Sequence, residues 1–266
     1  LIVEAIAKIS DFCKKLSKMK YMLNMEKHTD LSYLFLLGIA GSLIAIIGDI
    51  LLGYAVEELG FVAGFGIVRE GHSGIALWRL VLSLVLAMIA FTLYLPALWE
   101  VSGRLSRTHP KSARAFWWLS LADALGWGLL HAAYCWPIYA YRLLSDAVGS
   151  EIADSITASL MQAVFPFALF YVLLSIVPFG ILFILIVPGR SVFPRWTAFC
   201  TPAFLFGPLY ILYYQVLPLN TATYTLALGI MNQCMLALFT ALLFGQKPAA
   251  DVRPKNDARE SSTPEA

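Results

Sequence analysis

Charge is scarce in this chain, and the scarcity is uneven. Charged residues make up 14% of the 266 residues, against about 25% in soluble domains. Between Trp196 and Gln246 the sequence contains no Asp, Glu, Lys, Arg or His. The chain is 59% hydrophobic, and its mean hydropathy is +0.74. A soluble domain needs charged side chains over its surface, so this composition excludes one and indicates a protein embedded in a membrane.

Several sequence motifs are also missing, and each absence narrows the chemistry. The four cysteines form no CxxC pair, so we expect neither a zinc ribbon nor a disulfide framework. The sequence has no HxxxH or HExxH pattern, and we expect no metal site. It has neither a GxSxG nucleophile elbow nor a phosphate-binding Walker loop. From these absences we expect no cofactor. We also expect no nucleic-acid partner, because the basic loop 104–114 is suited to anchoring the chain at the membrane.

Six apolar stretches are long enough to cross a bilayer, which requires about 20 residues of helix. They are Leu31–Leu52, Ile75–Trp99, Ala115–Tyr141, Ile156–Val187, Arg195–Leu217 and Thr221–Phe244. The sequence Pro-Leu-Asn at 218–220 supplies a turn between the last two. The sequence therefore predicts an all-α fold, in which residues 28–245 form a polytopic bundle of six transmembrane helices.

Positively charged residues alternate from one side of these spans to the other. The N-terminal segment, the loops after the second and fourth spans and the C-terminal tail contain 16 of the 19 Lys and Arg residues. The other three are Arg69, Arg79 and Arg142. Loops rich in Lys and Arg face the cytoplasm in membrane proteins. We therefore expect both termini to be cytoplasmic and the basic loop 104–114 to act as a membrane anchor.

The two ends of the chain differ from the membrane domain. Within residues 1–27 apolar residues recur at helical spacing opposite a lysine-rich face, which predicts an amphipathic helix suited to anionic lipid. A second interpretation stays open, in which Met25 is the natural start and residues 1–24 are not native. The tail over 246–266 is rich in Pro, Ser and charge, so we expect it to be disordered.

Asp49 is the only charged residue of the first span, and an ionisable group there costs about 2.5–3.5 kcal/mol on insertion scales. It shares a helix face with Gly38, Ser42 and Ala45, a seam of small residues that permits close helix packing. Arg79, near the start of the second span, is expected at a similar depth. Two interpretations are open: an Asp49–Arg79 ion pair that fixes the packing, or a carboxyl group that carries a proton or anchors a ligand.

The third span carries a polar stripe. Asp123, Trp127, His131, Tyr134 and Tyr141 recur at intervals that return to one face of a helix. Asp123 and His131 are about 12 Å apart along the axis, too far for a direct hydrogen bond. The stripe is suited to relaying protons, to lining a pocket for a polar head group, or to hydrogen bonding with neighbouring helices.

Side-chain amides complete the set of candidate site residues. Gln162 is predicted near the outer end of the fourth span, and Asn232 and Gln233 near the middle of the sixth. The outer half of the bundle is thus more polar than the inner half, which predicts a cavity that opens outward. The candidate ligand-binding residues are Asp49, Arg79, Asp123, Trp127, His131, Tyr134, Gln162, Asn232 and Gln233.

Short motifs in the first three spans resemble a known family. Residues 48–54 (GDILLGY) end the first span, and an Arg-Leu pair at 79–80 opens the second. Tyr94 and Trp99 end the second span, and residues 126–133 (GWGLLHAA) lie in the third. Together these motifs resemble a family of bacterial six-span membrane proteins of unknown function.

The resemblance covers about residues 30–245 and implies a multi-pass protein of the bacterial inner membrane. It adds weight to Asp49, Arg79 and His131 as a functional set. The ceramidase-like membrane hydrolases also place Asp, His and Ser inside the membrane, but they need histidines in a late span. The last three spans of this chain contain no histidine, so we discount that family.

Three functions remain open from the sequence. The first is a protein that binds or transports a small amphiphile in the outward cavity, with membrane lipids as further partners. The second is an intramembrane enzyme that applies acid–base chemistry to a lipid or isoprenoid, with Asp49, Asp123 and His131 as candidate catalytic residues. The third is an accessory membrane subunit without catalysis, in which the polar residues only hold helices together. The sequence indicates no oligomeric state.

Overall fold

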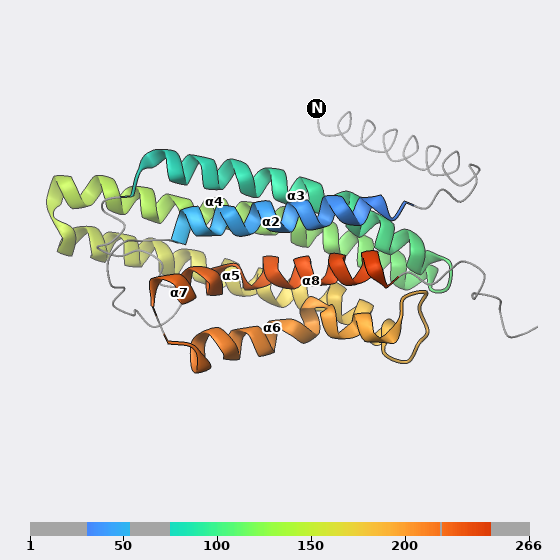
Figure 1. Cartoon of the computed structure of the whole chain (residues 1–266). Helices are drawn as coiled ribbons and strands as arrows, with labels where there is room; N and C mark the ends of the chain where they lie inside the picture. Colours follow the sequence, from blue (N-terminus) through green and yellow to red (C-terminus); the bar gives the residue numbers. More distant parts are fainter. Residues whose placement is uncertain (1–30, 54–74, 219, 246–266) are drawn as a thin grey trace, which may run out of the picture. The chain divides into compact units, whose positions relative to one another are not determined.

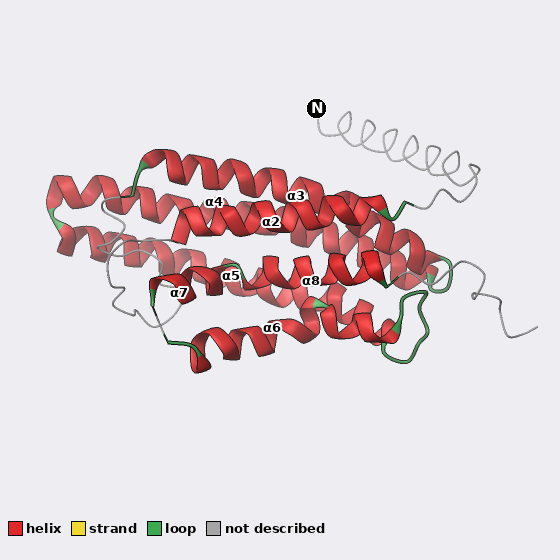
Figure 2. Ribbon diagram, in the orientation of Figure 1, coloured by secondary structure: helices red, strands yellow, loops and turns green. Residues whose placement is uncertain are grey.

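The computed structural model describes residues 31–53, 75–218 and 220–245, which form helices joined by short turns (Figures 1 and 2). The elements are α2 (Tyr33–Gly53), α3 (Leu77–Ser106), α4 (Pro110–Val148), α5 (Ser150–Ile186), the 3-10 helix η2 (Arg195–Cys200), α6 (Pro202–Ile211), the π-helix η3 (Leu212–Val216), α7 (Thr221–Leu228) and α8 (Ile230–Phe244). No strand occurs within these ranges, so the all-α prediction is confirmed for them. The predicted amphipathic helix over 1–27 and tail over 246–266 lie outside the residues described.

Several of these helices suit a lipid bilayer. By length and composition, α2, α3 and α5 are each able to cross a membrane. The pair α7 and α8 provides a fourth crossing if the two helices are taken as one bent span. With 39 residues α4 is long enough to cross, but it is less apolar than these helices. The long apolar helices indicate a protein embedded in a membrane.

The helices extend beyond the predicted spans. Residues 142–155, which the sequence assigned to a loop, are helical except at Gly149. Gly149 has a φ of 89°, a backbone conformation that favours glycine, and this one residue separates α4 from α5. The predicted fifth span, Arg195–Leu217, consists of η2, α6 and η3 in succession. The predicted sixth span is divided at Gly229, where α7 and α8 meet at a bend of 64°.

Helix α2 packs between α3 on one side and α7 and α8 on the other (Figure 1). Glycines make this packing close. A Cβ atom on Gly38 would lie 2.5 Å from the ring of Phe239 on α8, and one on Gly41 would lie 2.8 Å from the carbonyl oxygen of Ala90 on α3. The predicted small-residue seam of α2 is buried along its length, as its position between two neighbours requires.

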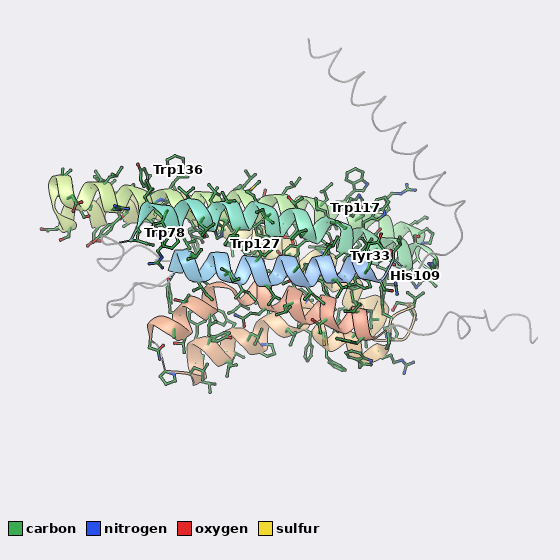
Figure 3. All side chains as sticks on the ribbon, turned by 45° about the horizontal axis from the view of Figure 1, so that its top comes forward. Tyr33, Trp78, His109, Trp117, Trp127 and Trp136 are labelled. Atoms are coloured by element: carbon green, nitrogen blue, oxygen red, sulfur yellow. The ribbon has the colours of Figure 1, made fainter. Side chains whose placement is uncertain are left out.

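Large apolar side chains cover the outside of the helices. Trp78, Trp136, Phe170 and Ile184 are each more than half exposed. Figure 3 shows Trp78 and Trp136 towards one end of the helices, Tyr33 and Trp117 towards the other, and Trp127 between them. An apolar surface bounded by aromatic residues at both ends is typical of a bundle surrounded by lipid.

The close contact between α2 and α3 leads to a prediction about stability. The Gly41→Ala variant should lower the free energy of unfolding by about 1–3 kcal/mol, because the backbone carbonyl of Ala90 cannot turn aside. Gly180 is a matched control, since a Cβ atom on this helical glycine meets no atom within 4 Å. Thermal unfolding in detergent measures both variants. Equal midpoints for Gly41→Ala and Gly180→Ala would contradict the packing described.

Candidate functional site

Asp49 lies near the end of α2 and brings three helices together. Its Oδ2 atom accepts a hydrogen bond of 2.7 Å from the Nδ2 atom of Asn232 on α8. Its Oδ1 atom lies 3.7 Å from the Nδ1 atom of His131 on α4. A Cβ atom on Gly229 would lie 3.0 Å from Oδ2, so the glycine at the bend between α7 and α8 leaves room for the carboxyl group.

The contacts of Asp49 continue through two side chains of α3. The hydroxyl group of Tyr94 donates to the Oδ1 atom of Asn232 at 2.9 Å. The Oγ atom of Ser83 lies 2.8 Å from the Nε2 atom of His131 and donates to the carbonyl oxygen of Gly48 at 2.7 Å. We call the five side chains of Asp49, Ser83, Tyr94, His131 and Asn232 the Asp49 network. It connects α2, α3, α4 and α8.

Hydrogen bonding in the Asp49 network assigns the tautomer of His131. The single hydroxyl proton of Ser83 is donated to the carbonyl of Gly48, so Ser83 Oγ accepts from His131 and the Nε2 atom carries a proton. The Nδ1 atom then faces the carboxyl group of Asp49. At 3.7 Å the Nδ1 atom and the carboxyl oxygen are beyond hydrogen-bond distance, so the contact places two titratable groups side by side.

The predicted ion pair between Asp49 and Arg79 is not formed among the residues described. The ion-pair and hydrogen-bond contacts of the Asp49 side chain there are those with Asn232 and His131. The register of α2 against α3 explains the difference. Ser83 lies at the level of Gly48, and Arg79 is one helical turn nearer the end of α3, where its side chain is half-buried.

A second buried carboxyl group, Asp123, lies on the same helix as His131 but in a different set of contacts. The hydroxyl group of Ser175 on α5 donates to the Oδ1 atom of Asp123 at 2.5 Å. The indole N–H of Trp127 donates to the Ser175 oxygen at 2.8 Å. Asp123 and Trp127 thus face α5, whereas His131 contacts side chains of α2 and α3. The predicted stripe of α4 is thus divided between α5 on one side and α2 and α3 on the other.

The remaining predicted site residues take other positions. Gln162 is exposed on α5 and belongs to neither set of contacts. Gln233 donates from Nε2 to the carbonyl of Leu226 at 2.7 Å and accepts from the hydroxyl of Tyr213 at 2.8 Å, so it supports the bend between α7 and α8. Tyr134 is buried one turn beyond His131, and its hydroxyl oxygen has no hydrogen-bond partner in the ranges described.

Ser83, Tyr94 and Ser175 are not among the predicted site residues, and Tyr94 enters the sequence prediction only through the family motifs. The sequence does contain a pattern that points to Ser83 and Tyr94. Ser83, Ala87, Ala90, Tyr94 and Ala97 recur three or four residues apart and form a buried face of α3. A face of small and polar residues on an otherwise apolar helix indicates contact with a neighbouring helix. This face of α3 packs against the small-residue seam of α2.

The chemistry available at the Asp49 network is proton transfer. Ser83, His131 and Asp49 follow one another in the order hydroxyl, imidazole and carboxyl, the order of a serine hydrolase triad. However, Ser83 is fully buried, and its proton is directed to the carbonyl of Gly48. In the part of the chain described, no group of three or more His, Cys, Asp or Glu residues is arranged to hold a metal ion.

The hydrogen bonds of Asn232 lead to a prediction of coupling. Asn232→Leu removes the acceptor of Tyr94 and the donor to Asp49, and should lower the free energy of unfolding by about 1–3 kcal/mol. Tyr94→Phe should cost about 1 kcal/mol in the parent protein and almost nothing in the Asn232→Leu background. A double-mutant cycle by chemical unfolding measures this. Tyr139→Phe, at a half-buried tyrosine of α4, is the control, because its effect on the free energy of unfolding should be the same in both backgrounds. Full additivity for Tyr94 would contradict the network.

Comparison with known proteins gives a family but no activity. No curated protein and no solved structure matches this chain. A family model matches residues 23–247, which include Asp49, Asp123 and all the helices described. This match agrees with the resemblance read from the motifs around Asp49 and His131. The chain belongs to the family of unknown function DUF6796.

Proposed function

We propose that this protein binds a small amphiphile at the Asp49 network and carries it through the membrane in exchange for a proton. The observation that supports this most is the buried contact between Asp49 and His131, which places two titratable groups side by side. A proton that is held without a fixed charged partner is available for release when a ligand binds. In many transporters such groups lie on the path of the substrate.

The bend between α7 and α8 supports the same proposal. Transporters often build substrate sites from helices that are broken within the membrane, because the break exposes backbone groups to the ligand. Here the break is at Gly229, and the carboxyl group of Asp49 lies against it. Gln233 also donates to the carbonyl of Leu226 just before the bend and accepts from Tyr213. A buried acid at a broken helix is thus the feature of this bundle that best suits a ligand.

We further propose six spans, with both termini in the cytoplasm of a bacterium and the bundle in its inner membrane. The spans beyond the four apolar crossings are α4 and the consecutive helices η2, α6 and η3. The alternation of Lys and Arg supports this arrangement, since 16 of 19 fall on one side. The lower apolarity of α4 is consistent with a helix whose polar side chains face other helices.

Reporter fusions test the number of spans. Alkaline phosphatase, which is active only outside the cytoplasm, should be active when inserted after Gly149 or Pro218 and inactive after Thr108 or Arg190. Each pair of neighbouring sites brackets one proposed span, and Thr108 with Gly149 brackets α4. Equal activity at Thr108 and Gly149 would remove α4 as a span. Equal activity at Arg190 and Pro218 would remove the segment of η2, α6 and η3.

Small molecules that purify with the protein test the proposed binding. We expect mass spectrometry to find an amphiphile with the parent protein that falls about tenfold or more in Asp49→Asn, because an amide cannot release a proton to the ligand. Asp146→Asn, at an exposed position of α4, is the matched control and should keep the amphiphile. Identical molecules in equal amounts from all three proteins would refute binding at Asp49.

The order of Ser83, His131 and Asp49 favours a second function, an intramembrane hydrolase that acts on a lipid ester. The direction of the Ser83 proton towards Gly48 and the complete burial of Ser83 argue against it. The same preparations separate the two functions when they are treated with a fluorophosphonate. Covalent modification of Ser83 would establish the hydrolase and displace the transporter, whereas an unmodified Ser83 agrees with binding and transport.

A further inference from the structure

We propose that one end of the bundle binds the head group of an anionic phospholipid. The binding surface forms where the turn between α3 and α4 meets the turn between α5 and η2, at a contact between His109 and Arg190. It shares no residue with the Asp49 network. The proposal therefore does not depend on the transport of an amphiphile.

A hydrogen bond joins the two turns. The Nε2 atom of His109, the residue before α4, lies 2.7 Å from the carbonyl oxygen of Arg190. A carbonyl oxygen only accepts, so the Nε2 atom carries a proton and donates it. On the second turn, the guanidinium group of Arg195 donates to the carbonyl oxygen of Pro188 at 3.3 Å. A Cβ atom on Gly189 would lie 2.8 Å from its Nε atom, so the guanidinium group packs on this turn, close to Arg190 in the chain.

The two turns and the first residues of α4 and η2 carry positive charge without negative charge to balance it. Among the residues described, the carboxylate of Glu100 on the last turns of α3 is paired with Arg104. Five other cationic side chains are exposed in this region, and none of them forms an ion pair with a described residue. We call them the His109 surface: Arg107, Lys111, Arg114, Arg190 and Arg195. Neighbouring charges of one sign repel, so an anion from outside the protein stabilises this surface.

Indole rings place the His109 surface at the boundary of the lipid. Lys111, Arg114 and Trp118 are spaced by three and four residues, so they share one exposed face of α4. Figure 3 shows Trp117, the neighbouring residue, at the same end of the helices as His109. Tryptophan side chains are enriched at the level of the lipid head groups in membrane proteins. The cations beside Trp118 are therefore at the depth of the head groups.

The combination of groups selects the kind of anion. Lys and Arg side chains make strong charge-assisted hydrogen bonds to phosphate oxygens. Clusters of such side chains beside a transmembrane helix attract anionic lipids. A soluble phosphate ion would use only the cations, whereas a phospholipid offers its phosphate to Arg114 and an acyl chain to the exposed ring of Trp118. The His109 surface therefore fits an anionic phospholipid better than a soluble anion.

Native mass spectrometry of the purified, delipidated full-length protein tests the proposal. We expect the parent protein to bind phosphatidylglycerol about tenfold more tightly than phosphatidylcholine with the same acyl chains. Arg114→Gln should weaken the binding of phosphatidylglycerol about fivefold. Arg142→Gln, which removes a cation from the opposite end of the same helix, is the matched control and should leave this affinity unchanged. His109→Leu removes no Lys or Arg but separates the two turns, and should weaken the binding about threefold.

Four results would overturn the proposal. The first is an equal affinity of the parent protein for the two lipids. The second is an equal loss of phosphatidylglycerol binding in Arg114→Gln and Arg142→Gln, and the third is an unchanged affinity in His109→Leu. The fourth is displacement of phosphatidylglycerol by an equal concentration of inorganic phosphate, which would assign the surface to a soluble anion. Lys111→Gln, on the same exposed face of α4, replaces Arg114→Gln in the test if the latter fails to fold.

Discussion

A carboxyl group inside an apolar bundle must find its partners in the protein, and this constraint explains much of the structure around Asp49. Lipid supplies no hydrogen bonds, so donors have to come from neighbouring helices. Asn232 donates to Asp49 from α8, His131 on α4 lies 3.7 Å from the same carboxyl group, and Ser83 and Tyr94 extend the contacts to α3. Such contacts require close helices, and the small residues of α2 and the glycine at the α7–α8 bend allow that approach.

Helix α4 carries both buried polar centres, and this accounts for its composition. Its His131 faces α2 and α3, whereas its Asp123 and Trp127 face α5. A helix with polar contacts on two sides cannot be as apolar as α5, whose large side chains lie mostly on the outside. The two centres also differ in their chemical groups. One places a carboxyl group beside an imidazole, and the other places a carboxyl group beside the hydroxyl group of Ser175.

The helical fold and the position of Asp49 followed from the sequence, because apolar runs and a single buried charge are visible in one dimension. The partners of Asp49 did not, because they come from α8 and α4, and the register of α2 against α3 sets Ser83 rather than Arg79 at the level of Gly48. A stripe of polar residues on one helix likewise cannot show that its members face different neighbouring helices, as Trp127 and His131 of α4 do. The bend at Gly229 was also missed, since a glycine inside an apolar run is compatible with a straight helix.

The account rests on the contact between Asp49 and His131, and a distance measurement in a bilayer tests it most directly. Solid-state NMR on protein with ¹³C-labelled aspartate and ¹⁵N-labelled histidine detects a carboxyl carbon close to a ring nitrogen, and His131→Gln assigns the signal. We predict a coupling between the Asp49 carboxyl carbon and the Nδ1 atom of His131, with a proton bound to Nε2. The absence of any such coupling in the parent protein would contradict the account.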